Sequence, residues 1–178
     1  MIILEPTDQV KKTGKDGSIF VTIGHYALSN SKNTSVIPNF TIFGLGSCIA
    51  LILFDELNRV SAMSHILLPR VFSNKKILFP HKYASLSVKL LLEELLNHGA
   101  VRENIKAFFI GGSKIFNIEN NLMGNENTIS VRAELNALKI HIIVEDTGGL
   151  KGRNVIFDPK SFSLYVKSTG GIDYKKLY

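Results

Sequence analysis

Two apolar runs joined by a short polar turn constrain the fold of this chain most strongly. The first run covers residues 49–54, the turn covers residues 55–59, and the second run covers residues 60–69. A polar turn between two apolar runs is typical of antiparallel neighbours in a sheet. We therefore expect a pair of strands that brings residues distant in sequence side by side.

The only cysteine of the chain stands at a glycine-rich junction directly before the first run. This junction reads Gly44-Leu45-Gly46-Ser47-Cys48, and His65 lies in the second run. The thiolate is the reactive form of cysteine, and a free thiol with a pKa of about 8.5 is mostly protonated at neutral pH. A histidine within hydrogen-bond reach can take this proton and leave an ion pair. We therefore expect iodoacetamide to label Cys48 faster than a model thiol, and His65→Ala to slow the labelling.

The glycines beside Cys48 suit the same chemistry. Glycine permits positive φ angles and close approach of a substrate, and it exposes backbone N–H groups that can stabilise an oxyanion. Gly46 and Ser47 are therefore candidate oxyanion or substrate-binding residues, together with Gly111 and Gly112, which follow a predicted strand. A nucleophile (Cys48), a base (His65) and exposed backbone N–H groups together favour acyl transfer.

Purely structural roles for these residues are the alternative to a catalytic role. A single cysteine is most often a small buried apolar residue, and a lone histidine in an apolar run is most often a core residue. The glycines also suit tight turns. Gly44-x-Gly46 begins like a dinucleotide-binding fingerprint, but Ile49 stands in place of the third glycine. Residues 147–154 lack the Gly-Lys-Ser/Thr of a phosphate-binding loop, which argues against nucleotide hydrolysis.

Size and composition indicate one globular domain in a reducing compartment. The chain has 178 residues, 45% of them apolar and 20% charged, which allows a sizeable core. No apolar run reaches the length of about 18 residues that crosses a bilayer, and the N-terminus does not read as a signal peptide. One cysteine forms neither an internal disulfide nor a cysteine-rich zinc site. We expect a cytoplasmic protein with no metal, no cofactor and no membrane insertion.

The net charge of +6 favours an acidic partner. The lysines are scattered in pairs along the chain and form no basic stripe interleaved with aromatic residues, so we expect no nucleic-acid binding. An acidic protein surface as partner accounts for the positive charge as well as nucleic acid would, and a role of the charge in solubility alone is the third explanation.

The remaining pattern predicts helices and strands in alternation. We expect a mobile leader (1–18), helices over 82–98 and 128–137, further strands over 19–23, 105–110 and 139–146, a terminal hairpin of 155–160 and 163–167, and a frayed polar tail (168–178). Early strand pairs followed by mixed elements indicate an α/β or α+β layered sandwich, a single domain in which a mixed sheet packs against helices. The three glycine-rich loops would gather at one rim of the sheet near Cys48.

The motifs resemble one known family, the chemoreceptor glutamine deamidases called CheD. The segment 44–50 resembles the family's Leu-Gly-Ser-Cys-Val-Ala signature, and residues 63–69 resemble its Met-x-His-x-x-Leu-Pro. Lys82-Tyr83-Ala84, Gly111-Gly112, Asn127 and the segment 146–153 follow in the family's order. The resemblance covers roughly residues 19–167, and the order and spacing of the motifs make it specific.

The resemblance implies a hydrolase that converts chemoreceptor glutamines to glutamates and releases ammonia. Cys48 would be the nucleophile and His65 the general base, with chemoreceptor cytoplasmic helices and a CheC-type phosphatase as partners of a monomer or heterodimer. The family's third residue is a threonine six positions before the cysteine, where this chain has Ile42; its threonine is Thr41. Since a shift of one residue turns a strand side chain to the opposite face, either a bulge restores Thr41 or another group orients His65. The displaced threonine also supports an alternative, a non-catalytic adaptor that binds the phosphatase or receptor.

Overall fold

The two apolar runs form the middle of a six-stranded sheet in a computed structural model that describes residues 2–3, 17–33, 37–72, 76–115 and 122–178. The runs are β5 (Ile49–Asp55) and β6 (Val60–Ile66), which pair antiparallel with Ala50 opposite His65. The order of the sheet is β1-β3-β6-β5-β7-β8, and only β7 and β8 run parallel. The other strands of this sheet are β1 (Ile2–Ile3), β3 (Tyr26–Asn30), β7 (Lys106–Gly111) and β8 (His141–Thr147).

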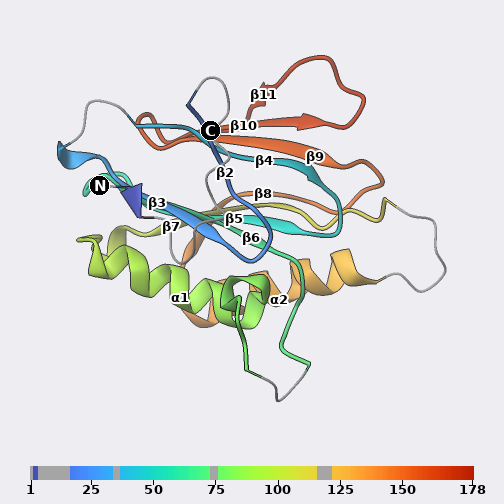
Figure 1. The fold of residues 1–178 in the computed structure, drawn as a ribbon, viewed down its shortest axis with the longest axis horizontal. Coiled ribbons are helices and arrows are strands. Elements are labelled where there is room, and N and C mark those ends of the chain that lie inside the picture. The colour runs from blue at the N-terminus through green and yellow to red at the C-terminus, as the bar shows by residue number, and fades with distance from the viewer. Residues whose placement is uncertain (1, 4–16, 34–36, 73–75, 116–121) are drawn as a thin grey trace.

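A second sheet of five strands lies against the first (Figure 1). Its order is β11-β10-β9-β4-β2, and only β4 and β2 run parallel. Its strands are β2 (Ile19–Phe20), β4 (Phe40–Leu45), β9 (Arg153–Asp158), β10 (Ser163–Ser168) and β11 (Lys175–Lys176).

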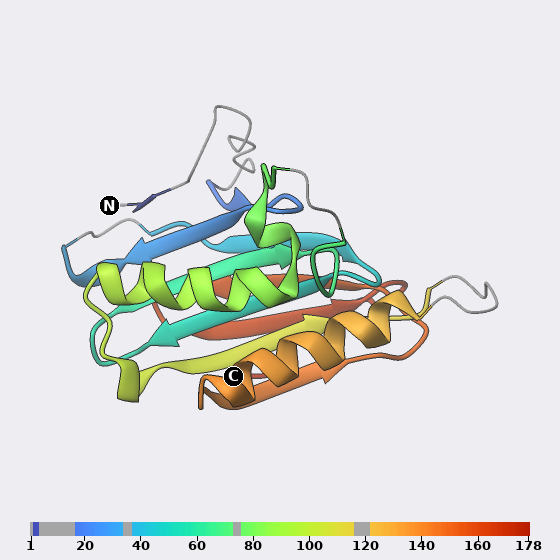
Figure 2. The same cartoon turned by 90° about the horizontal axis from the view of Figure 1, so that it is seen from below.

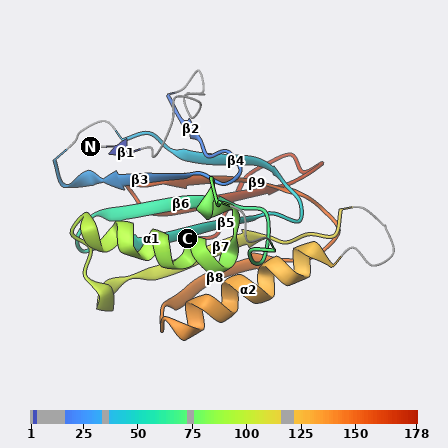
Figure 3. The ribbon, with the colours of Figure 1, turned by 60° about the horizontal axis from the view of Figure 1, so that its bottom comes forward.

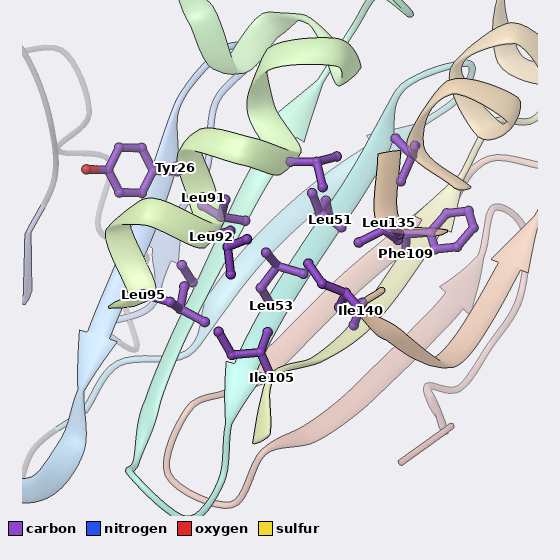
Figure 4. Packing of buried hydrophobic residues seen from close by; sticks show 14 of the residues in the cluster. Tyr26, Leu51, Leu53, Leu91, Leu92, Leu95, Ile105, Phe109, Leu135 and Ile140 are labelled. Carbon is purple, nitrogen blue, oxygen red and sulfur yellow. The ribbon is translucent and has the colours of Figure 1, made fainter. Parts of the chain in front are cut away.

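Two α-helices cover the outer face of the six-stranded sheet, as Figures 2 and 3 show. They are α1 (Ala84–Asn97) and α2 (Met123–Ala137). Three short 3-10 helices complete the described elements: η1 (Ser31–Asn33), η2 (Pro80–Lys82) and η3 (Arg102–Asn104). The apolar faces of the helices pack on side chains of the sheet such as Leu51 and Leu53, and together they form one of two cores (Figure 4).

The second core lies between the two sheets. Ala50, Ile52 and Phe54 point into it, whereas the alternate residues Leu51 and Leu53 point to the helices. β5 is therefore buried on both faces, which explains why its sequence is a continuous apolar run. Phe54 packs near the rings of Phe108 and Phe157 in this core.

The predicted layered sandwich is confirmed, with two corrections of detail. The sequence did not separate two sheets, and α2 begins at Met123 rather than at residue 128. The expectation of a frayed tail is wrong, because β11 pairs with β10 and both Leu177 and Tyr178 pack on the inter-sheet core. Of the leader, Ile2–Ile3 pair with β3, and residues 4–16 lie outside the described residues.

Candidate active site

Cys48 lies in a short turn, residues 46–48, that connects β4 to β5. Its thiol is free and half-buried. All three carbonyl groups of the turn accept hydrogen bonds: that of Gly46 from the N–H of Ser113 (2.8 Å), that of Ser47 from the amide of Asn127 (2.8 Å), and that of Cys48 from the N–H of Gly112 (2.9 Å). Within the described part of the chain, the three N–H groups of the turn donate to no backbone carbonyl. The turn therefore has its carbonyls engaged while its N–H groups lack a carbonyl acceptor, the pattern that an oxyanion site requires.

Gly111 and Gly112 support this turn from behind. Gly111 has a φ of +125°, and a Cβ atom there would lie 2.1 Å from the carbonyl oxygen of Cys48. No side chain fits in that space, so glycine is required for the close packing of β7 on the turn. The N–H of Gly112 already donates to the carbonyl of Cys48, and the substrate-binding or oxyanion role of Gly111 and Gly112 stays a prediction. Gly46 and Ser47 remain candidates.

Asn127 joins the cysteine turn to the strand that carries the histidine. Its side chain is fully buried, and its amide nitrogen donates to the carbonyls of Ser47 (2.8 Å) and Leu67 (2.9 Å). Leu67 follows His65 by two residues, so this amide fixes the distance between the two segments. The sequence analysis named Asn127 in the family resemblance but gave it no role, because the predicted helix began at residue 128 and left Asn127 outside it.

The three glycine-rich loops are the cysteine loop (44–48), residues 111–113 and residues 147–154. They lie together, as expected from the sequence: the N–H of Ser113 donates to Gly46, and the N–H of Gly148 donates to Gly111. Arg153 donates to both carboxylate oxygens of Asp146 (2.8 and 3.1 Å) and to the carbonyl of Gly148 (2.8 Å). Arg153 also donates to the hydroxyl of Ser113, which in turn bonds to the carbonyl of Lys151 (2.8 Å). These bonds fasten the loops that hold the cysteine turn.

His65 lies on the same side of the six-stranded sheet as Cys48. It stands directly opposite Ala50, whose side chain points between the sheets, and Cys48 precedes Ala50 by two residues. Such a diagonal pair has Cα atoms about 7–8 Å apart, within reach of an imidazole ring. The two side chains make no direct hydrogen bond in the described structure.

The ring of His65 has one nitrogen engaged and one available. The Nδ1–H donates to the carbonyl of Val21 at 3.0 Å, and since a carbonyl only accepts, this bond assigns the proton to Nδ1. Burial lowers the pKa of His65, although the bond to Val21 acts in the opposite direction. His65 is therefore neutral at pH 7, with Nε2 free to accept a proton.

Burial also raises the pKa of the Cys48 thiol, an effect that the N–H of Cys48 itself partly offsets. Burial therefore favours the protonated thiol at neutral pH, and the pre-formed ion pair with His65 stays a prediction.

Thr41 and His65 line one open cleft of about 670 Å³. β4 contains a bulge after Thr41: from Ile42 to Leu45 the strand takes three steps while β9 takes two, from Val155 to Arg153. This extra residue lies between Thr41 and Cys48, and the third catalytic role of Thr41 stays a prediction. Cys48 is absent from the described residues that line the cleft.

A group other than Thr41 contacts the ring of His65, which was the other alternative. The hydroxyl of Thr41 donates to the carbonyl of Ile19 at 3.3 Å, whereas the carbonyl of Val21 is the group that orients His65. Thr41 acts on that arrangement through its backbone, because its carbonyl accepts from the N–H of Val21 at 2.9 Å.

The described residues form neither a cluster of metal ligands nor a membrane-spanning helix. No three His, Cys, Asp or Glu side chains in the described ranges gather closely enough to hold a metal ion. No helix in that part of the chain is both long and apolar enough to cross a membrane.

Comparison with known proteins places this architecture in a family. The family model described as "CheD chemotactic sensory transduction" matches residues 67–168. A "Probable chemoreceptor glutamine deamidase CheD" of Clostridium botulinum (strain Hall) is 36% identical over 154 residues, which cover 84% of this chain and 93% of the relative. This chain belongs to the CheD family. The Clostridium acetobutylicum CheD of the same description is 36% identical over 143 residues, covering 78% of this chain and 86% of the relative.

The match to the CheD family model begins at Leu67, two residues after His65. Cys48 and His65 therefore lie outside that match. Both lie inside the similarity to the C. botulinum CheD, because an alignment over 84% of the chain includes these positions wherever it starts.

Proposed function

We propose that this CheD protein hydrolyses the side-chain amide of chemoreceptor glutamines, with Cys48 as nucleophile and His65 as general base. One observation carries the proposal: every carbonyl of the Cys48 turn accepts a hydrogen bond and its N–H groups donate to no backbone carbonyl of the described residues, on the side of the sheet where His65 has its proton on Nδ1 and none on Nε2. This arrangement suits a reaction in which negative charge develops on an oxygen beside the sulfur.

The first half of the reaction forms a thioester. As Sγ of Cys48 bonds to the amide carbon, the thiol proton passes to Nε2 of His65, and the carbonyl electrons move to the oxygen. The N–H groups of Gly46, Ser47 and Cys48 donate to that oxyanion, an effect of about 3–4 kcal/mol for one such donor in a well-studied protease. When the carbonyl re-forms, the C–N bond breaks and the imidazolium of His65 returns the proton to the departing ammonia.

The second half hydrolyses the thioester. Neutral His65 takes a proton from a water molecule as the water oxygen bonds to the thioester carbon. The C–S bond then breaks, the imidazolium returns its proton to the sulfur, and the product is a glutamate side chain. Val21 and Thr41 position the base throughout, because the carbonyl of Val21 holds Nδ1–H and so leaves Nε2 as the nitrogen that accepts a proton.

Cys48→Ala tests this proposal. We expect ammonia release from a purified chemoreceptor cytoplasmic fragment to fall at least about a thousandfold, because the thioester cannot form. Peptide mass spectrometry of the fragment should show the exchange of NH₂ for OH only with the wild-type protein. An unchanged thermal melting curve controls for folding, and retained activity in a folded Cys48→Ala protein would remove Cys48 from the mechanism.

The second candidate function is a non-catalytic adaptor that binds a CheC-type phosphatase or the receptor, as a heterodimer in the first case. The raised pKa of Cys48 and the missing hydrogen bond to His65 favour it. Wild-type protein that binds the receptor fragment or the phosphatase and leaves every glutamine unmodified would establish this function in place of catalysis.

A further inference from the structure

The segment between β6 and α1 exposes several large apolar side chains. Leu78 is 69% exposed, Phe79 43% and Ile77 37%. In Figure 1 this segment is the green loop that leaves β6 and returns to α1. Exposed apolar side chains gathered in one short segment indicate a surface that is covered by a partner.

These side chains border a groove of about 280 Å³. Val71, Ile77, Leu78 and Phe79 supply its apolar lining, and Lys76 and Lys82 add positive charge. We call these six residues the docking surface. The sequence between residues 66 and 83 contains no aspartate or glutamate, so no acidic side chain of the same segment neutralises the two lysines.

The docking surface adjoins the cleft of Thr41 and His65. The ring of Phe79 lies against that of His25, with centroids 5.2 Å apart, and His25 is one of the cleft-lining residues. The same cleft exposes Ile23 and Phe43, which are 45% and 48% exposed. The apolar surface therefore continues from the groove to the cleft, with Phe79 between them.

The end of the segment that carries Phe79 is fixed to the body of the protein. The carbonyl of Phe79 accepts from the N–H of Lys82 (3.1 Å), and the carbonyl of Lys82 accepts from the N–H groups of Leu67 and Leu68 (both 3.0 Å). These backbone hydrogen bonds hold the Phe79 end of the groove in place beside β6, the strand that contains His65.

We propose that the docking surface binds an acidic amphipathic helix of the chemoreceptor, next to the helical residue whose glutamine is modified. This inference rests on the proposed function, because it takes the chemoreceptor as the substrate. An apolar side chain of the helix fills the groove, carboxylates on the flank of the helix meet Lys76 and Lys82, and the glutamine is directed to the cleft side of Phe79. A helix fits better than an anionic membrane. An apolar groove can receive a side chain that projects from a helix, whereas binding to a membrane requires protein side chains that project into the lipid.

Binding of a receptor cytoplasmic fragment to the full-length protein, measured by fluorescence anisotropy, tests the proposal. We expect Leu78→Ser to weaken binding about tenfold, because a buried apolar contact is lost. Lys76→Glu should weaken it severalfold at low ionic strength and less at high ionic strength, because salt screens the interaction with carboxylates. In steady-state deamidation both losses should appear in KM.

Matched controls lie at the opposite end of β5. Leu57→Ser changes a side chain that is 79% exposed in the β5–β6 turn, and Lys160→Glu changes an exposed lysine in the neighbouring turn, whose carbonyl accepts from Arg59. Both controls should keep the wild-type affinity for the fragment. Equal affinities for Leu78→Ser and Leu57→Ser would overturn the proposal, and so would wild-type protein that fails to bind the fragment.

Vesicles containing phosphatidylglycerol separate the helix from a membrane. If Leu78→Ser loses vesicle binding but keeps its affinity for the fragment, the surface serves a membrane and the proposal is wrong. The proposed function fails independently: binding that depends on Leu78 and Lys76 without any ammonia release would uphold the docking surface and refute catalysis.

Discussion

Cys48 and His65 are both held in neutral form before substrate binds. Burial acts on the two groups in opposite directions, raising the pKa of the thiol and lowering that of the imidazole, because it disfavours the charged form of each. A thiolate–imidazolium pair would place two charges in this partly dry region without a direct hydrogen bond between them. The oxyanion donors become useful only when a substrate carbonyl occupies the turn, so we infer that substrate binding initiates the proton transfer.

The pH dependence of alkylation tests this inference at the level of the residue. Because the pKa of Cys48 is raised, a smaller fraction is thiolate at any given pH, and iodoacetamide should label it more slowly than a model thiol at neutral pH. The rate should rise with pH through an inflection above that of the model thiol. His65→Gln should leave this profile nearly unchanged.

The opposite result is equally informative. Labelling of the wild-type protein that is faster than the model thiol at neutral pH, and slow in His65→Gln, would show that the ion pair exists without substrate. Glutathione is a suitable model thiol, and the melting curve of His65→Gln controls for folding.

At the scale of the element, local patterns predicted what local contacts decide. The β5–β6 hairpin and α1 follow from runs and spacings within about 20 residues, and both are confirmed. The sequence raised a bulge in β4 as one of two alternatives, but the parallel pairing of β2 with β4 and the bond from His65 to Val21 were not predictable, because each depends on a partner far along the chain. The sequence thus identified the candidate nucleophile, the candidate base and Thr41, but not Val21, whose carbonyl holds the ring of His65.

Gly111→Ala tests the contact between β7 and the cysteine turn. A Cβ at this position would lie 2.1 Å from the carbonyl oxygen of Cys48, and the φ of +125° is unfavourable for alanine. We expect a loss of about 2–5 kcal/mol in the free energy of unfolding, measured by urea denaturation, and loss of activity because the turn is displaced.

Gly99→Ala is the matched control for Gly111→Ala. Gly99 has a φ of +91°, and no atom lies within 4 Å of its added Cβ. It should therefore lose only about 1–2 kcal/mol from backbone strain and keep its activity. Equal losses in the two variants would show that the close approach to Cys48 does not determine the structure of the turn.

At the scale of the whole molecule, two separate hydrophobic cores stabilise the fold. The helices and the six-stranded sheet enclose one core, and the second sheet closes the other over the face that carries Ala50 and His65. The C-terminal residues belong to this second core, although their polar composition predicted a frayed tail. Composition misled here because two residues, Leu177 and Tyr178, decide the packing of the segment.

Tyr178→Ala tests whether the C-terminal residues stabilise the inter-sheet core. The ring of Tyr178 lies 5.0 Å from that of Phe108 and 5.9 Å from that of Phe54, and its hydroxyl donates to Glu56 at 3.0 Å. We expect Tyr178→Ala to lower the free energy of unfolding by about 1–3 kcal/mol. Tyr178→Phe keeps the ring and loses only the partly exposed hydrogen bond, so it should lose about 1 kcal/mol or less. Ile172→Ser, at a side chain that is 90% exposed, should leave stability unchanged. If Tyr178→Ala and Ile172→Ser gave the same urea midpoint, the C-terminal segment would contribute nothing to the core, and the second sheet would be held by β4, β9 and β10 alone.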